Sequence, residues 1–171
     1  MRPATWEDKS FVDDLLFTTM RHDVEATWPN DPVAQRHYFE INRFDPSNTR
    51  IVQLNGNDIG RISTTLRPDC LFVDGIHILP EYQHRGIGKK VVKGVFAEAR
   101  EKNLPVRATV LKVNLPSLNG SLSIGFEVVE EKDHRLHIQY LPAPYDMDSY
   151  RRETATAPSC PLPQRTGSGC G

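Results

Sequence analysis

Residues 78–92 read Ile-Leu-Pro-Glu-Tyr-Gln-His-Arg-Gly-Ile-Gly-Lys-Lys-Val-Val, and this stretch decides the fold. An apolar run from Leu71 to Leu79 leads into it and predicts a strand. The residues that follow predict an amphipathic helix, because apolar side chains recur at helical spacing at Ile87, Val91, Val95 and Ala99, with Val92 and Phe96 beside them. Two glycines, one residue apart, therefore lie at a strand-to-helix turn.

This turn predicts an anion-binding site. The first N–H groups of a helix lack intrahelical acceptors, and the helix dipole places partial positive charge beside them. Glycine at positions 86 and 88 lets a bound group approach the backbone closely. Hydrogen-bond donors and positive charge surround the two glycines, at Gln83, His84, Arg85, Lys89 and Lys90. We interpret the stretch as a cradle for a phosphate or a pyrophosphate.

Two well-known phosphate loops do not fit the stretch. A P-loop needs glycine five residues before its Gly-Lys pair, and that position holds Gln83. A dinucleotide-binding fingerprint needs a third small residue at position 91, which is Val91. The ligand is therefore a phosphate compound of another kind.

Pro80 to Gly88 resembles the acetyl-CoA pyrophosphate loop of the GNAT acyltransferases, whose core pattern is Arg/Gln-x-x-Gly-x-Gly/Ala. Gln83, Gly86 and Gly88 fill that pattern. A second resemblance follows in the expected order and at the expected separation. GNAT enzymes have a strand, then Asn-x-x-Ala/Ser, then a helix ending in Leu/Ile-Gly-Phe; the matching residues here are Val110–Asn114, Ser117 and Ile124–Phe126. An unrelated α/β domain with a glycine-rich turn remains the alternative.

The rest of the chain predicts helices and strands in the GNAT order. The expected elements are a short strand at 1–4, a helix over 5–20, a loop or irregular helix over 21–30, a helix over 31–44, a hairpin of 50–54 and 59–66, strands at 70–79 and 106–111, a helix at 117–123, and an antiparallel pair of 126–131 and 135–141. The resemblance implies an α/β (α+β) fold over residues 1–141. Its central sheet is mixed and mostly antiparallel, is flanked by helices, and has middle strands that splay apart. Residues 142–171 are rich in Pro, Gly and Ser and are expected to form a disordered tail.

Composition excludes several classes of protein. The 171 residues suffice for one domain with a core, and 21 basic against 22 acidic residues do not indicate a nucleic-acid partner. No apolar run is long enough to predict a membrane span. The three cysteines, Cys70, Cys160 and Cys170, have no metal-binding spacing and favour a reducing, cytoplasmic compartment over a disulfide framework.

The resemblance implies how acetyl-CoA would be held. Pantetheine would lie in the splay and pair with main-chain groups of the first splayed strand, at Ile76, His77 and Ile78. The pyrophosphate would receive main-chain amides of the loop, at His84, Arg85, Gly86, Ile87, Gly88 and Lys89. The side chain of Asn114 would lie near the thiol arm, and Ser117 of the same motif belongs to the expected cofactor set.

Acyl transfer to an amine needs a base to take the amine's proton, and the sequence offers one candidate. Asp74 interrupts the apolar strand 71–79, where a carboxylate is costly to bury without a partner. The alternative is a structural Asp that accepts hydrogen bonds from a neighbouring loop. Asp23 and Glu25 follow the first helix and are the other acids near the expected acceptor region.

The sequence leaves several alternatives for the acid that protonates the leaving thiolate. Many GNAT enzymes have a tyrosine five residues before the Phe of the second motif, and this chain has Ser121 there. A serine hydroxyl is a much weaker acid than a phenol. Ser121 would have to act through a water, or another group such as Tyr82, His77 or Tyr140 would serve, or the thiolate would leave unaided.

The acceptor is predicted to be the primary amine of a small molecule. Residues 1–50 hold nine acidic and six basic residues, a mild excess that would suit a cationic amine. A protein or peptide N-terminus remains an alternative acceptor. A CoA-binding module without turnover is a third interpretation, suggested by Ser121. The sequence leaves open whether the protein forms a homodimer.

Overall fold

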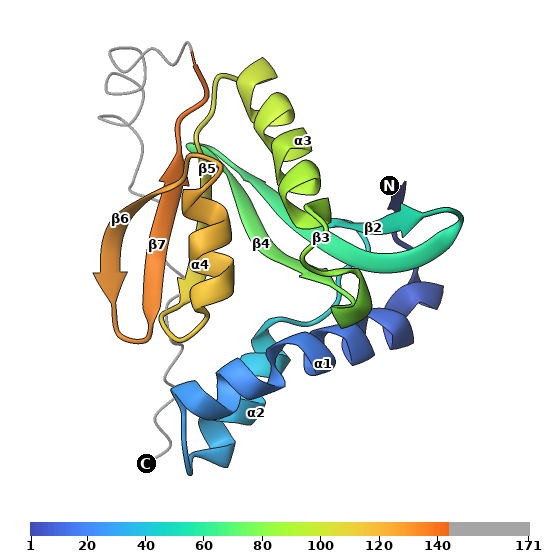
Figure 1. The fold of residues 1–171 in the computed structure, drawn as a ribbon, viewed down its shortest axis with the longest axis vertical. Coiled ribbons are helices and arrows are strands. Elements are labelled where there is room, and N and C mark those ends of the chain that lie inside the picture. The colour runs from blue at the N-terminus through green and yellow to red at the C-terminus, as the bar shows by residue number, and fades with distance from the viewer. Residues whose placement is uncertain (144–171) are drawn as a thin grey trace.

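The computed structural model describes residues 1–143, which form one seven-stranded sheet with helices on both faces (Figure 1). The strands lie in the order β1-β2-β3-β4-β5-β7-β6. All neighbours are antiparallel except β4 and β5, which are parallel. The strands are β1 (Arg2–Pro3), β2 (Thr49–Leu54), β3 (Asn57–Arg67), β4 (Cys70–Ile78), β5 (Val106–Leu111), β6 (Glu127–Lys132) and β7 (Arg135–Tyr140). The expected mixed, mostly antiparallel sheet is confirmed.

Four α-helices and two short 3-10 helices complete the described part of the chain. They are η1 (Trp6–Asp8), α1 (Lys9–Thr27), α2 (Pro32–Ile41), η2 (Pro80–Tyr82), α3 (Ile87–Glu101) and α4 (Leu115–Leu122). Local chemistry sets several of their ends. Asp31 Oδ1 accepts a hydrogen bond from the amide of Ala34 at 2.9 Å, with Pro32 in the first helical position, as the sequence predicts. Among residues 1–143, no helix combines the length and the apolar character that crossing a bilayer would require.

Two layers of apolar side chains hold the helices to the sheet. On one face, α3 and α4 cover the largest cluster, which contains Val91, Val95 and Phe96 of α3 and Ile62, Val73 and Val110 of the sheet. On the other face, α1 and α2 meet each other and the sheet through Leu16, Met20, Val24, Tyr38 and Leu111. A third cluster, which includes Val12 and Ile51, joins α1 to β2. The loop between β4 and α3 therefore lies between two helical layers (Figure 1).

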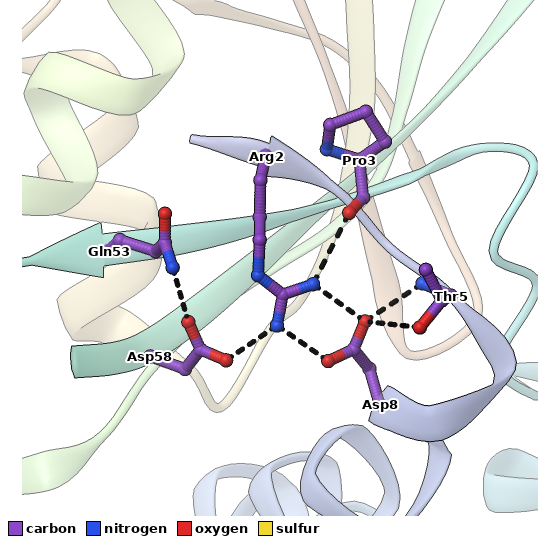
Figure 2. A network of polar contacts seen from close by, with 6 residues as sticks. All are labelled: Arg2, Pro3, Thr5, Asp8, Gln53 and Asp58. Carbon is purple, nitrogen blue, oxygen red and sulfur yellow. Dashed lines mark hydrogen bonds and ion pairs between the residues drawn. The ribbon is translucent and has the colours of Figure 1, made fainter. Parts of the chain in front are cut away.

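A polar network anchors the N-terminus to the β2–β3 hairpin (Figure 2). Arg2 donates to both carboxylate oxygens of Asp8, at 2.8 and 2.6 Å, and to Asp58 Oδ2 at 2.6 Å. The backbone amide of Thr5 donates to Asp8 Oδ2 at 2.8 Å, which is the expected capping contact at the start of the first helical segment. Gln53 donates to the other oxygen of Asp58 at 2.9 Å. The network fixes the beginning of α1 relative to β2 and β3.

The structure corrects the expected course of the first two helices. Residues 21–30 were expected to form a loop or an irregular helix, but α1 continues to Thr27. The reason is that Val24 lies four residues after Met20 and is 1% exposed, so it extends the buried stripe by another turn. Helix α2 ends at Ile41, three residues before the expected end at Phe44. Only residues 142 and 143 of the expected tail belong to the described part of the chain; residues 144–171 lie outside it.

Candidate functional site

The loop between η2 and α3 has the backbone geometry of an anion cradle. Gly86 is the N-cap of α3 and has φ = 74°, in the left-handed region, and His84 also has a positive φ of 59°. A non-glycine residue at 86 would be strained, which explains the glycine there. Gln83 Nε2 donates to the carbonyl of Ile78 at 2.8 Å, so this side chain ties the loop to the end of β4. Arg85 Nη2 donates to the carbonyl of Glu81 at 2.7 Å and closes the loop from within.

The amides of this loop are available to a ligand. The first main-chain bond of α3 runs from the amide of Lys90 to the carbonyl of Gly86. Within residues 1–143, no hydrogen bond is found for the amides of residues 84–89, the six amides that the sequence assigned to the pyrophosphate. A Cβ at Gly86 would meet no atom within 4 Å, and one at Gly88 would meet only Ile76 Cδ1, at 3.8 Å. Six main-chain amides without internal partners thus lie in the loop and the first turn of α3, beside two glycines whose missing side chains leave space.

Strands β4 and β5 separate beside this loop. They pair only at Leu71–Val73 with Val106–Ala108, and beyond these residues β4 has no strand partner on that edge. Figure 1 shows the two strands diverging toward the start of α3. The expected splay is therefore present, and it opens toward the end of β4 that runs into the anion loop.

The register of β4 decides which of its main-chain groups face the splay. The amide of Leu79 donates to the carbonyl of Ile59. In an antiparallel pair, every second residue forms main-chain hydrogen bonds to the neighbouring strand, so from Leu79 back along β4 such residues alternate with ones that do not bond to β3. By this alternation, the main chain of His77 forms hydrogen bonds with that of Arg61 on β3, whereas the main-chain groups of Ile76 and Ile78 point toward β5. Of the three residues of β4 expected to pair with pantetheine, Ile76 and Ile78 therefore have main-chain groups that face the splay, and His77 does not. The side chain of His77 points to the sheet face covered by α1.

Asp74 stands at a β-bulge. Ser63 of β3 pairs with Gly75, and its neighbour Thr64 pairs with Val73, so Asp74 is the extra residue between them. A bulge shifts the side-chain alternation by one residue and re-aims side chains, and bulges are common next to active sites. Here it brings Ile76 and Ile78 to the α3 side and Gly75 and His77 to the α1 side. Asp74 directly follows Val73, the last residue of β4 that pairs with β5.

The surroundings of Asp74 favour a raised pKa. Burial by the protein around it raises the pKa of this carboxyl, although the side chain is still reached by solvent. A hydrogen bond from Thr65 Oγ1 to Asp74 Oδ2, at 2.8 Å, acts in the opposite direction, as do the charges of Arg67 and Arg61. A carboxylate with a raised pKa and access to solvent is suited to accept a proton.

His77 is buried against α1 and is neutral. Its Nδ1 lies 2.9 Å from Thr19 Oγ1 on α1. The hydroxyl of Thr19 has the carbonyl of Leu15 as an acceptor at 2.7 Å, and while it donates there, Nδ1–H of His77 donates to Thr19 Oγ1. Burial and the nearby charge of Arg61 lower the pKa of His77 to about 3. Its Nε2 is consequently an uncharged hydrogen-bond acceptor.

Arg61 is a residue of this region that the sequence analysis did not identify. It lies on β3 opposite His77 and is 4% exposed. Its Nη1 donates to Ser63 Oγ at 3.1 Å, and its buried Nε has no hydrogen-bond partner. The signal in the sequence was a charged residue directly between Gly60 and Ile62 of the expected hairpin strand.

The second motif forms the expected strand and helix, but its polar residues have local partners. Asn114 Oδ1 accepts a hydrogen bond from the amide of Ser117 at 2.9 Å and caps α4. Asn114 therefore has a structural role, while no hydrogen bond from its amide nitrogen is found within residues 1–143. Ser121 is half-buried in the last turn of α4, where its carbonyl accepts from the amides of Ile124 and Phe126. No hydrogen bond to its hydroxyl is found within residues 1–143.

The other proton-donor candidates differ in their surroundings. Tyr140 stacks on Phe96 with ring centroids 3.6 Å apart and packs into the main core cluster. Tyr82 lies in η2, with Arg85 5.3 Å from its ring centre. Asp23, on α1, has a raised pKa because it is partly buried, whereas Glu25 pairs with Arg21 on the same helix. Within the described residues, no three His, Cys, Asp or Glu side chains are grouped as metal ligands would be.

Comparison with known proteins decides the family. The family model described as the acetyltransferase (GNAT) family matches residues 12–122. The chain belongs to the GNAT family of acetyltransferases. The sequence-based expectations of a GNAT fold and of an acetyltransferase are therefore confirmed. Among curated proteins, no sequence matches this chain.

Solved structures of GNAT enzymes share the fold. PaiA N-acetyltransferase from Thermoplasma acidophilum, solved in complex with coenzyme A, has a TM-score of 0.66 at 14% identity, covering 82% of this chain and 96% of that one. An N-acetyltransferase from Staphylococcus aureus Mu50 has a TM-score of 0.59 at 15% identity, covering 81% and 97%. N-acetylglutamate synthase from Neisseria gonorrhoeae, complexed with coenzyme A and N-acetyl-glutamate, has a TM-score of 0.60 at 16% identity, covering 82% of this chain and 34% of that one. At such identities the likeness concerns the fold.

Proposed function

We propose that this GNAT protein transfers the acetyl group of acetyl-CoA to the primary amine of a small molecule. The observation that carries the proposal is the combination of six free loop amides with a splay between β4 and β5. Two of the structural neighbours described above were solved with coenzyme A, which supports acetyl-CoA as the donor.

The residues present fit the phosphates and the pantetheine arm of acetyl-CoA. Main-chain amides of residues 84–89 can donate to the pyrophosphate, where the helix dipole adds positive potential and Lys89 and Lys90 add charge. The outward-facing main-chain groups of Ile76 and Ile78 can pair with the amides of pantetheine as a neighbouring strand would. When bound, acetyl-CoA supplies an acetyl group that is activated as a thioester.

Asp74 is the proposed base on the acceptor side. Its carboxylate can take a proton from the ammonium of the acceptor, directly or through a water, because burial raises its pKa and solvent still reaches it. The neutral amine that remains has the lone pair needed for attack. His77 is less suited to this task, since a pKa of about 3 makes it a weak base.

The proposal is tested by separating cofactor binding from turnover. Acetyl-CoA affinity is measured by calorimetry, and thiol release is measured against a panel of small amines and peptide N-termini. Thiol release with small amines is expected, and release with peptides alone would show that the acceptor is a protein or a peptide. Binding without release for every amine would contradict the proposed activity.

A glycine pair tests the place of binding. Gly88→Val puts a branched side chain between the start of α3 and Ile76, and it should lower acetyl-CoA affinity at least about 10-fold. Gly94→Val is the matched control, because a Cβ at Gly94 meets no atom within 4 Å and the residue lies on the same helix. Equal affinity in the two folded variants would show that the cofactor binds elsewhere.

A further inference from the structure

A cation is buried on the acceptor side of the sheet, and the protein does not neutralise it. Arg61 is 4% exposed, and within residues 1–143 it forms no ion pair. Its single hydrogen bond goes from Nη1 to Ser63 Oγ, whose hydroxyl lies 2.8 Å from Thr49 Oγ1. Buried charges in proteins are usually paired, so an arginine left in this state indicates a missing anion.

The unpaired part of Arg61 is the edge that binds carboxylates best. Nη1 is used by Ser63, while Nε has no partner although it is buried. No hydrogen bond from Nη2 is found within the described residues either. Nε and Nη2 together form the side of the guanidinium that donates two parallel hydrogen bonds to one carboxylate.

The same edge lies next to the proposed reaction site. A Cβ built on Gly75 would be 3.8 Å from Arg61 Nη2 and 3.0 Å from His77 Nε2, and it would meet no atom of α1 or α2 at these distances. The polar ends of Arg61 and His77 therefore converge on Gly75, where even a methyl group would be in tight contact with the imidazole. Asp74 is the adjacent residue on β4 and lies near enough to Arg61 to act on its charge.

The titratable side chains that already lie near Arg61 do not neutralise its charge. His77 is neutral and faces it across β3 and β4. Asp13 and Asp74 act on Arg61 electrostatically without forming an ion pair with it, and Asp13 is paired with Lys9. Tyr38 of α2 also lies close, and burial raises the pKa of its phenol, so it too is uncharged at neutral pH.

We propose that Arg61 binds a carboxylate of the acceptor, so that the acceptor is an amino acid or another small amine that carries a carboxylate. This inference rests on the proposed acetyltransferase function and names the class of its acceptor. Asp74 faces the amine and Arg61 holds the carboxylate, with Gly75 between them. His77 Nε2, an acceptor without a proton, is placed to receive an N–H of the same molecule. A single guanidinium edge can bind a planar carboxylate through two parallel hydrogen bonds. The mild acidic excess of residues 1–50 would suit a cationic amine, and the buried arginine adds a carboxylate to the same molecule.

The test compares acceptors that differ only in the carboxylate. Thiol release from acetyl-CoA is measured with L-amino acids, with their carboxamides and with the corresponding decarboxylated amines. In the wild-type protein, kcat/KM should be about 10- to 100-fold higher for the best amino acid than for its carboxamide. Arg61→Gln should remove that difference by lowering kcat/KM for the amino acid and leaving the carboxamide within about threefold. Arg61→Lys keeps the charge without the paired donors and should fall between the two.

Controls separate recognition from folding. Gly75→Ala keeps Arg61 but places a methyl group 3.0 Å from His77 Nε2 and 3.8 Å from Arg61 Nη2, and it should reduce the preference for carboxylates; Gly94→Ala, which faces open space, should not. Acetyl-CoA affinity and circular dichroism should be unchanged in Arg61→Gln. If that variant does not fold, Gly75→Ala decides alone.

The outcomes distinguish this inference from the proposed function. Equal acetylation of carboxamides and acids by the wild type, or an equal loss of both in Arg61→Gln, would overturn the inference and leave the acetyltransferase in place. If no amine is acetylated, the proposed function fails. The role of Arg61 is then tested by the binding of amino acids and of their carboxamides. In that case, amino acids should still raise the melting temperature of the CoA-loaded wild type more than their carboxamides do. The absence of such a difference would overturn the inference as well.

Discussion

His77 Nδ1 on β4 lies 2.9 Å from Thr19 Oγ1 on α1, and this contact joins the sheet to the helix that covers this face of it. With the Thr19 hydroxyl donating to the carbonyl of Leu15, His77 donates from Nδ1 and leaves Nε2 without a proton. The bond thus fixes the tautomer of a buried imidazole beside Arg61. Because His77 is buried and neutral, its protonation affects the stability of the fold.

The protein should lose stability as the pH falls from 7 to 5, partly because of His77. The folded pKa of about 3 is below the unfolded value near 6.5, so below pH 6.5 the unfolded chain takes up a proton that the folded one does not. Stability from this group is full above pH 6.5 and declines toward pH 3. Between pH 7 and 5 the loss is about 2 kcal/mol. Urea unfolding of wild type and His77→Gln at the two pH values measures it, and His77→Gln should show a smaller decline.

The exposed His22 on α1 supplies the control for this measurement. His22→Gln should retain the wild-type decline between pH 7 and 5. A decline of the same size in His77→Gln and in the wild type would mean that His77 is charged in the folded protein.

A second stability effect should appear at lower pH, in the Arg2–Asp8 pair of Figure 2. Hydrogen bonds from Arg2 lower the pKa of Asp8 from 3.8 to about 2, with the amide of Thr5 adding to the effect. The pair therefore stabilises the fold fully above pH 4, and the contribution disappears as the pH falls through 2. Its size is about 2 kcal/mol, since each unit of pKa difference corresponds to about 1.4 kcal/mol.

Asp8→Asn should lower the free energy of unfolding by about that amount at pH 7 and by little near pH 2. Chemical denaturation at the two pH values checks this. Asp14→Asn, on an exposed part of α1 and without an ion pair among the described residues, should change stability little at either pH. A loss in Asp8→Asn that does not depend on pH would contradict the assignment of the effect to the charge of Asp8.

Sequence patterns predicted the elements well where a periodic apolar stripe and a clear boundary residue coincide. Strand β5 begins after Pro105 and matches its expected bounds of 106–111, and Asp31 caps α2 as expected. The end of α1 was placed too early because the polar residues around Val24 masked its place in the buried stripe. The signal was present, but it consisted of one apolar residue per turn.

Sequence alone could not place the residues on the acceptor side. Asp74 was visible as a charge in an apolar strand, but its position in a bulge depends on the register with Ser63 and Thr64 of another strand. Arg61 was equally visible, yet a charge in a hairpin strand is ordinary unless its side chain is known to be buried. The free main-chain groups of Ile76 and Ile78 likewise follow from a register that the sequence does not contain.

Ser121 lies where many relatives have a tyrosine, and we expect Ser121→Tyr to raise kcat if protonation of the thiolate limits the rate. Ser121 is half-buried in the last turn of α4, and its hydroxyl has no partner in the described residues, so Ser121→Ala should change kcat by less than about threefold. Steady-state kinetics with saturating acetyl-CoA measure both. A large loss in Ser121→Ala that tyrosine does not restore would show that the serine has a role of its own, such as holding a water.

Asp74 and Thr65 provide the sharpest test of the chemistry, because the hydrogen bond from Thr65 changes the pKa of Asp74. Asp74→Asn should lower kcat/KM by roughly 10²–10⁴-fold with little change in acetyl-CoA affinity, and the acidic limb of the pH–rate profile should flatten. Thr65 Oγ1 stabilises the charged carboxylate through its bond to Oδ2, so it lowers the pKa of Asp74. Thr65→Val removes that bond at nearly constant volume and should raise the pKa of Asp74. A base with a higher pKa is protonated over a wider range, so the acidic limb should move to higher pH while the plateau remains. If Asp74 only attracts a cationic acceptor, the loss in Asp74→Asn will appear mostly in the acceptor KM. The limb will then persist in that variant, which a general base does not allow.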